Sequence, residues 1–431
     1  MAETTAIAGA FDGVHAEPRT QQRRDFVPML VLCTPILCAS LFSKFGIPGY
    51  SSLGIGIALP LMMMALAIGM LNNCVRIEPR RLGFYCITIA VLVLPQLLQA
   101  GTFSQQSLMM LAALHIPYVM VVTRGHELAP RALKFFLHIA TLLAVLAVAQ
   151  YFLQSFVDLS LLYPIDNFVP VQFVVQGFNA MGTIHYLSSQ VRATGVFMLE
   201  PSFLTQFLGI AIVAETLTSK QLWRLGLYGA GILVAHAGTG ILILAICMPF
   251  VVITRRRWDL VLLGVVGLAV ILAFGEALNL DMITSRTNEF SDPNSSGFAR
   301  FVGGFYMFDE MLWPNLPRAL FGYGAGSFME YTHLFTTEVA DMPMTKMIFE
   351  FGLIGAAVYF AFIASCLFSS PLPKLLSLGI AVSFLLNGMY VPFSHGLALG
   401  LLVLTSLPAN RTTPVGKPQP VQVIHPVSDR A

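Results

Sequence analysis

The sequence predicts an all-α polytopic membrane protein with about 10–12 transmembrane helices. First, 56% of its 431 residues are hydrophobic and only 11% are charged, whereas a soluble domain carries about 25% charged residues. Second, the mean hydropathy is +0.76, and the apolar stretches run for about 16–22 residues, close to the thickness of a bilayer core. Third, the basic residues are concentrated between alternate stretches, as the positive-inside rule requires.

Twelve apolar stretches are candidate membrane spans, and three of them are short, which gives the lower limit of the range. They cover residues 26–43, 52–71, 83–100, 106–122, 133–155, 196–217, 224–237, 239–254, 258–276, 345–368, 374–390 and 394–408.

The two ends of the chain are polar and flank one integral membrane domain over residues 26–408. Residues 1–25 carry three arginines just before the first apolar stretch, and no small-residue cleavage site follows, so we expect a retained first helix. Residues 409–431 are polar and rich in proline, which predicts a disordered tail.

Loop charges predict the orientation. With twelve spans and a cytoplasmic N-terminus, 18 of the 24 Lys and Arg residues lie in cytoplasmic segments. The rule that Lys and Arg stay inside therefore places both termini in the cytoplasm. Two long segments, 157–195 and 277–344, then lie outside, which is the periplasm if the membrane is the inner membrane of a Gram-negative cell. The first segment is rich in aromatic and turn residues.

Several functional classes find no support in the sequence. No basic block is long enough to indicate a nucleic-acid partner. The six cysteines form no CxxC pair and avoid both long loops, so the pattern favours neither disulfides nor a zinc site. No His, Asp or Glu spacing is typical of a metal site, and no cofactor is expected. An internal repeat, common in secondary transporters, is not evident.

Glu200 and Pro201 interrupt the apolar stretch at 196–217. A carboxylate at membrane depth is costly unless it is paired or faces water, and a proline disturbs the preceding turn. One interpretation is a late-starting helix whose carboxylate lines an outer cavity. The other is a simple helix cap, because carboxylates and proline both favour a helix N-terminus.

Three arginines in the outer segments are candidate ligands of a lipid diphosphate: Arg192, Arg286 and Arg300. A guanidinium fork binds two phosphate oxygens at once. For Arg192, an interfacial anchor whose side chain reaches toward water is the alternative.

Four further residues of the second outer segment and the next span are candidates. His333 is a candidate general base near neutral pH, with an ordinary surface histidine as the alternative. Asp341 follows it, and Lys346 and Glu350 lie near the start of "MTKMIFEFGLIGAAVYF", where the alternative is a merely interfacial charge. The upstream "GYGAG" lacks the Lys-Ser/Thr of a nucleotide loop, and its glycines predict a tight turn or a close backbone approach.

Several short motifs in this order resemble the superfamily of Wzy-type polysaccharide polymerases and O-antigen ligases. They are "RATGVF" at 192–197, "GTGIL" at 238–242, "ARF" around Arg300, "GYGAGSF" at 322–328 and "EFGLIG" at 350–355. The "EPS" after the arginine motif looks like the exopolysaccharide polymerase branch, including polymerases of xanthan-like gums. Ligases tend to carry a His-Asn pair where this chain has Asp341, which argues against a ligase and leaves the identity of the base open.

The resemblance implies a GT-C-like membrane glycosyltransferase that needs no metal ion. Such an enzyme transfers a growing glycan from undecaprenyl diphosphate to a second lipid-linked repeat unit at the periplasmic face of the inner membrane. It implies that Arg192, Arg300 and Arg286 bind the diphosphate. Glu200, Asp341 or His333 would then accept or orient the acceptor hydroxyl proton, while Lys346 and Glu350 line the cavity. A polysaccharide co-polymerase is a further candidate partner. An O-antigen ligase and a flippase for lipid-linked oligosaccharide are the alternatives.

Overall fold

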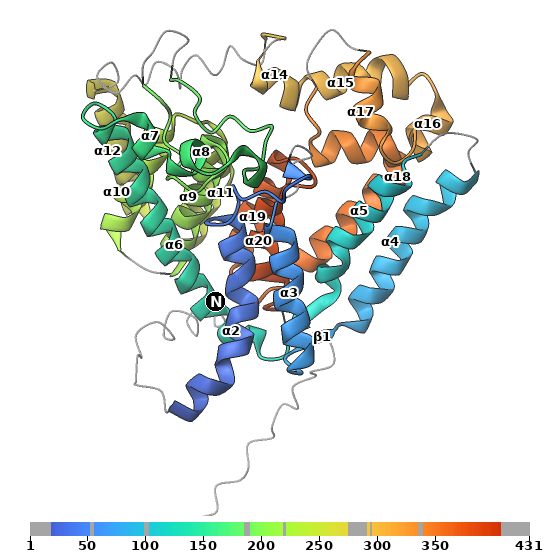
Figure 1. The fold of residues 1–431 in the computed structure, drawn as a ribbon, viewed down its shortest axis with the longest axis horizontal. Coiled ribbons are helices and arrows are strands. Elements are labelled where there is room, and N and C mark those ends of the chain that lie inside the picture. The colour runs from blue at the N-terminus through green and yellow to red at the C-terminus, as the bar shows by residue number, and fades with distance from the viewer. Residues whose placement is uncertain are drawn as a thin grey trace, which may run out of the picture.

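The protein is almost entirely helical in a computed structural model, which confirms the predicted all-α membrane fold (Figure 1). The structure describes residues 19–51, 56–98, 103–184, 190–218, 221–274, 291–293, 295–334 and 339–406. The longer helices are α2 (Arg19–Ala39), α3 (Ala58–Leu71), α4 (Pro79–Leu98), α5 (Gln105–His115), α6 (Gly125–Leu153), α9 (Pro201–Thr218), α10 (Leu222–Ala235), α11 (Thr239–Arg255), α12 (Trp258–Phe274), α18 (Pro343–Leu367) and α19 (Lys374–Leu386).

Short helical turns make up the rest of the described helical structure. In chain order they are η2 (Ile116–Val119), α7 (Leu159–Leu162), α8 (Pro164–Phe168), η3 (Val171–Phe173), α14 (Ser296–Phe301), α15 (Gly303–Met307), the π-helix η5 (Phe308–Leu312), α16 (Leu316–Phe321), α17 (Ser327–Thr332), α20 (Pro392–Leu397) and the π-helix η6 (Ala398–Val403). Four helices of the described chain, α4, α6, α9 and α18, are long and apolar enough to cross a membrane. Other helices fall on the remaining predicted spans, whose crossings stay a prediction.

The predicted span at 106–122 is too long at its end. The stretch 106–122 begins as helix α5 but stops at His115. Pro117 lies in the following 3₁₀ turn, and it removes a backbone donor that a continuing α-helix needs. The β-branched end of the stretch forms strand β2 (Met120–Val122), which pairs antiparallel with β1 (Val75–Ile77).

Helix α9 forms the centre of the bundle. It packs against α6, α10, α11 and α19, and almost all of its residues are buried. Such an all-round apolar helix is typical of a bundle core. Helices α14 to α17 gather above α18 at one end of the molecule (Figure 1), so these short helices of the second long connecting segment lie at the end where α18 begins.

Two glycines interlock the loop at 322–326 with a break in α18. Gly322 and Gly352 have φ values of +80° and +69°, and a Cβ on Gly352 would lie 2.3 Å from the backbone of Leu320. The N–H groups of Tyr323 and Gly324 donate to the carbonyls of Phe349 and Glu350, both at 2.9 Å. The predicted close backbone approach is confirmed, and it supplies donors to carbonyls that the helix break releases.

We expect Gly352→Ala to destabilise the protein strongly. A positive φ with ψ near 180°, as at Gly352, costs a non-glycine residue about 1–3 kcal/mol, and the clash with the Leu320 backbone adds to that cost. The thermal unfolding midpoint of purified protein in detergent measures the effect. Gly229→Ala is the matched control, because a Cβ there meets nothing within 4 Å; equal midpoints for the two variants would contradict the interlock.

Candidate active site

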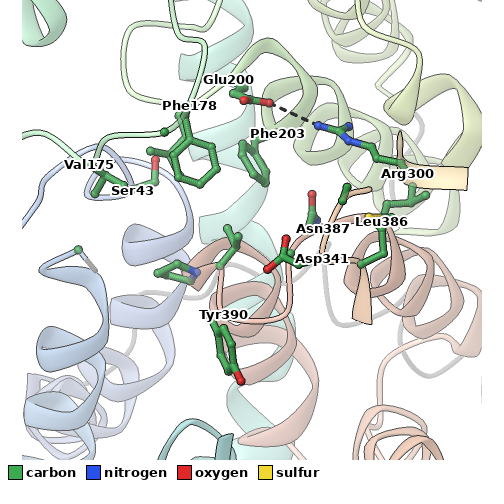
Figure 2. Close-up of a pocket in the computed structure, with 18 residues that line it drawn as sticks. Ser43, Val175, Phe178, Glu200, Phe203, Arg300, Asp341, Leu386, Asn387 and Tyr390 are labelled. Atoms are coloured by element: carbon green, nitrogen blue, oxygen red, sulfur yellow. Dashed lines mark ion pairs between the residues drawn. The ribbon is translucent and has the colours of Figure 1, made fainter. Parts of the chain in front are cut away.

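A polar pocket lies where the ends of several helices meet (Figure 2). Its cavity volume is about 360 Å³, and its walls come from segments that are far apart in the sequence. The lining residues are Ser43, Gly56, Val175, Gly177, Phe178, Leu199, Glu200, Phe203, Arg300, Ala340, Asp341, Met342, Leu386, Asn387, Gly388, Tyr390, Val391 and Pro392.

Three helices begin at the wall of this pocket. Helices α9, α18 and α20 start at Pro201, Pro343 and Pro392, each directly after a residue that lines the cavity. Proline suits the first helical position, because an N–H group at that position has no partner within the helix and its absence costs no hydrogen bond. The unpaired N–H groups of a helix start carry a partial positive charge. The backbone therefore biases the pocket toward anions.

Glu200 and Arg300 face each other across the pocket (Figure 2), with 3.7 Å between carboxylate and guanidinium. The Glu200 carboxylate also accepts hydrogen bonds from the Asn179 N–H at 3.2 Å and the Ser202 hydroxyl at 3.1 Å. Its backbone carbonyl accepts from the Phe203 N–H at 3.2 Å, as expected of the residue that begins a helix. Glu200 thus directly precedes α9, and its backbone carbonyl accepts a hydrogen bond of the first helical turn while its side chain faces the cavity.

Asp341 is the second carboxylate of the pocket, and it comes just before α18. A Cβ on Gly388 would lie 3.1 Å from its Oδ1, so the carboxylate packs directly against the backbone of the turn at 386–392. Burial raises the pKa of the Asp341 carboxyl above its ordinary value, while the Lys346 ammonium and a backbone hydrogen bond partly oppose the rise. A carboxylate with a raised pKa is a stronger proton acceptor.

A buried amide network fixes Asn387 in the pocket wall. Its amide nitrogen donates to Gln206 Oε1 and to the Ser394 hydroxyl, both at 2.8 Å, and its Oδ1 accepts from Gln206 at 2.9 Å. The Ser383 hydroxyl also donates to Gln206 at 2.8 Å. A fully bonded buried network of this kind holds its members in one arrangement, so α9, α19 and α20 keep a fixed relation beneath the cavity.

The first long connecting segment covers the pocket through contacts with the residues that follow α2. The backbone N–H of Gly46 donates to Phe173 at 2.7 Å, and that of Val175 donates to Lys44 at 2.9 Å. The buried Lys44 ammonium also pairs with Asp166 at 2.5 Å. These bonds bring Phe178 over the cavity, where its ring lies 5.9 Å from that of Phe203.

Residues 36–377 match the family model described as WcaD colanic acid polymerase. The chain belongs to this family of polymerases. No curated protein and no solved structure matches it. The match includes Glu200, Arg300 and Asp341 and ends before the turn at 386–392. It confirms the predicted resemblance to a Wzy-type exopolysaccharide polymerase, and with the apolar helices it makes this a membrane protein.

Of the predicted site residues, the structure of this WcaD-family polymerase brings three into the pocket: Glu200, Arg300 and Asp341. Arg192 and His333 do not line it. His333 is exposed at the end of α17, and Arg286 lies outside the described residues. The roles predicted for Arg192, His333 and Arg286 stay predictions.

Arg192 is separated from the pocket by an irregular stretch of chain. Residues 195–200 form turns, not the helix that the apolar pattern suggested. Gly195 and Val196 both have positive φ, at +62° and +71°, which is rare for a β-branched residue such as valine. The Gln150 side chain holds this turn by accepting from the N–H groups of Thr194 and Gly195. Two turns of helix between Arg192 and Glu200 therefore do not form.

Lys346 and Glu350 form a buried ion pair beside the pocket. The Lys346 ammonium lies 2.9 Å from the Glu350 carboxylate, with the side chains only 3% and 1% exposed. The ammonium also lies over the rings of Phe328 and Tyr390, at 5.6 and 5.5 Å. Because Tyr390 lines the cavity, the pair supports the pocket wall from behind and does not line the cavity itself.

We expect Lys346→Met to lower stability by about 3–5 kcal/mol, because it leaves the Glu350 carboxylate buried without its partner. The thermal midpoint in detergent reports the loss. The double variant Lys346→Met/Glu350→Leu removes both charges and should recover part of the stability. If the single variant unfolds at the wild-type temperature, the pair is not a structural element.

Sequence reasoning missed Ser43, Phe178, Asn387 and Tyr390 as pocket residues. Asn387 carried the clearest signal, since an amide followed by glycine interrupts the predicted span 374–390 in "LLNGMYVPF", and α19 ends at Leu386 just before it. Asn387 carries no charge, so the pattern of charged residues beside apolar stretches does not mark it. Among the described residues, no group of three or more His, Cys, Asp or Glu side chains could hold a metal ion.

Proposed function

We propose that the protein joins undecaprenyl-diphosphate-linked oligosaccharide repeat units into exopolysaccharide at the periplasmic face of the inner membrane. The observation that carries this is the polar pocket, where Arg300, three helix N-termini and two carboxylates meet at one end of a membrane bundle. The family supplies the coarser activity, polymerisation into exopolysaccharide. The lipid-linked donor, its diphosphate leaving group and the face of the membrane are parts of the proposal.

In the proposed reaction, a hydroxyl oxygen of the acceptor sugar attacks the anomeric carbon of the donor glycan. The new C–O bond forms while the bond from that carbon to the diphosphate breaks, and its electron pair stays on the diphosphate oxygen. The Asp341 carboxylate accepts the hydroxyl proton. Arg300 and the helix N-termini stabilise the negative charge that develops on the leaving diphosphate.

Glu200 has a different part in this scheme. Its ion pair with Arg300 and its bond to the Asn179 N–H leave the carboxylate oriented across the cavity. We assign it to orienting the guanidinium and binding a sugar hydroxyl. The ring of Phe178 over the cavity offers an apolar face for a sugar ring. The proposal includes no metal ion, since no spacing in the sequence is typical of a metal site, and polymerisation in excess EDTA tests that part.

Deletion of the gene, followed by extraction of lipid-linked sugars, tests the function against its alternatives. The proposal predicts single repeat units on the carrier lipid, exposed on the outer leaflet. Repeat units trapped on the inner leaflet would indicate a flippase. Full-length polymer retained on the carrier lipid would indicate a ligase.

The proposed topology places both termini in the cytoplasm, and the segments 157–195 and 277–344 in the periplasm. Reporter fusions test it, with alkaline phosphatase active after residue 177 and green fluorescent protein fluorescent after residue 431. The reverse pattern would put the pocket on the wrong side of the membrane for this reaction.

A further inference from the structure

An apolar groove runs along α18 and α19, next to the polar pocket. Its volume is about 450 Å³, and it is lined by apolar side chains from these two helices and Phe368 just beyond α18. Alanines form much of its surface, at positions 356, 357, 364 and 381, and the rings of Phe360 and Phe384 stand beside them. The small alanine side chains lie between larger apolar side chains, so the surface of this helix pair is concave along the groove.

The groove has the length and the opening that a long membrane lipid needs. Its lining residues on and near α18 run from Met344, before the break in α18 at Gly352, to Phe368 just after the helix. The unbroken part from Leu353 to Phe368 alone spans roughly 22 Å at the helical rise, most of the roughly 30 Å of a bilayer core. Met344, Leu353 and Leu385 on its rim are 42%, 44% and 39% exposed. The groove is therefore open to the side, toward the hydrocarbon phase.

The polar pocket and the groove meet at one end of this helix pair. Met342 lines the pocket and Met344 lines the groove. On α19, Leu386 lines the pocket and its neighbour Leu385 lines the groove. A single molecule with an anionic head and a long apolar chain can thus place the head near Arg300 and the chain along α18.

We propose that this groove binds the polyisoprenoid chain of the lipid-linked substrate whose diphosphate lies at Arg300. The inference rests on the proposed function, because that function supplies the diphosphate head. It adds the surface that selects a long isoprenoid lipid. It also explains how binding energy far from the reacting carbon holds the donor in position.

Filling the groove tests this assignment. Ala357 and Ala364 both line the groove and are exposed, so Ala357→Trp and Ala364→Trp add bulk inside the channel without overpacking the core. Each variant is assayed in nanodiscs with two substrates, the oligosaccharide on undecaprenyl diphosphate and the same oligosaccharide on a geranyl diphosphate. Ala90→Trp, on the exposed side of α4, is the matched control.

We expect both groove variants to raise KM for the undecaprenyl substrate by about ten-fold or more, since burial of about two methylene groups is worth that factor. Their KM for the geranyl substrate should match that of the wild type, and Ala90→Trp should change neither value. Unchanged use of the undecaprenyl substrate would overturn the proposal and leave the groove to bulk lipid. An equal loss on both substrates would also overturn it.

A photoreactive undecaprenyl diphosphate gives a second test that needs no variant. With the diazirine at the far end of the chain, we expect crosslinks to peptides of α18 and α19, and crosslinks spread over α4 and other exposed helices would contradict the assignment. If wild-type protein polymerises neither substrate, the proposed function itself fails. The crosslinking result does not depend on polymerisation, so it distinguishes that failure from a failure of the groove to bind the lipid chain.

Discussion

Arg300→Ala is expected to reduce polymerisation by about 100- to 1000-fold, the usual effect of removing one group that stabilises charge in a transition state. Arg300 is the arginine that lines the pocket with Glu200 and Asp341 among the described residues. Its side chain is 27% exposed, so its loss leaves no fully buried charge and the protein should stay folded. The rate of polymer formation by purified enzyme from a lipid-diphosphate oligosaccharide measures the effect.

Two variants make the Arg300 result specific. Arg300→Lys keeps the charge but loses the planar fork that binds two oxygens, so we expect an intermediate rate. Arg318→Ala is the matched control from the same connecting segment, since the Arg318 guanidinium packs on the ring of Tyr323 at 4.9 Å and does not line the pocket. If Arg300→Ala and Arg318→Ala polymerise equally well, the pocket does not hold the diphosphate.

Asp341→Asn is expected to lower kcat/KM by about 100- to 10,000-fold, the range typical of a lost general base. The pH dependence adds a signature. Burial raises the pKa of Asp341, and the base works only when deprotonated, so wild-type activity should fall as the pH drops through that raised pKa. The acidic limb should therefore lie above the ordinary aspartate value of 3.8. The Asn variant should lack this limb in its residual activity.

Asp309→Asn serves as the control for this change, because Asp309 is exposed on η5 and does not line the pocket. It should keep both the wild-type rate and the acidic limb. An Asp341→Asn enzyme that retains the limb would assign the base to another group, with Glu200 and then His333 the next to replace. An unchanged rate would remove Asp341 from the mechanism.

Hydropathy predicted the helices well because the bilayer imposes both their length and their composition. Each predicted span overlaps a helix of the structure, and the main misplaced end, at 106–122, lies where Pro117 stops a helix within an apolar run. Hydropathy responds to the apolar side chains of Met120 to Val122 and not to their backbone. A hydropathy profile therefore does not distinguish a short strand from a helix within an apolar stretch.

The site was harder to predict, because it is assembled from chain segments that are distant in the sequence. Glu200 and Arg300 were each marked by a charge beside an apolar stretch, but nothing in the sequence pairs them. The predicted span at 196–217 does not begin as a helix, since the turn at Gly195 and Val196 redirects the chain and α9 starts only at Pro201. Asn387 enters the pocket through a hydrogen-bond network that only the packed helices create.

The proposed mechanism requires that each new glycosidic bond releases one lipid diphosphate from the Arg300 pocket. The most direct test incubates the purified protein in nanodiscs with a defined undecaprenyl-diphosphate oligosaccharide and counts both products. For the wild type we expect a ladder of polymers with one undecaprenyl diphosphate released per bond, and for Arg300→Ala a severe loss of both products. Polymer growth without matching release, or full activity of Arg300→Ala, would contradict this mechanism.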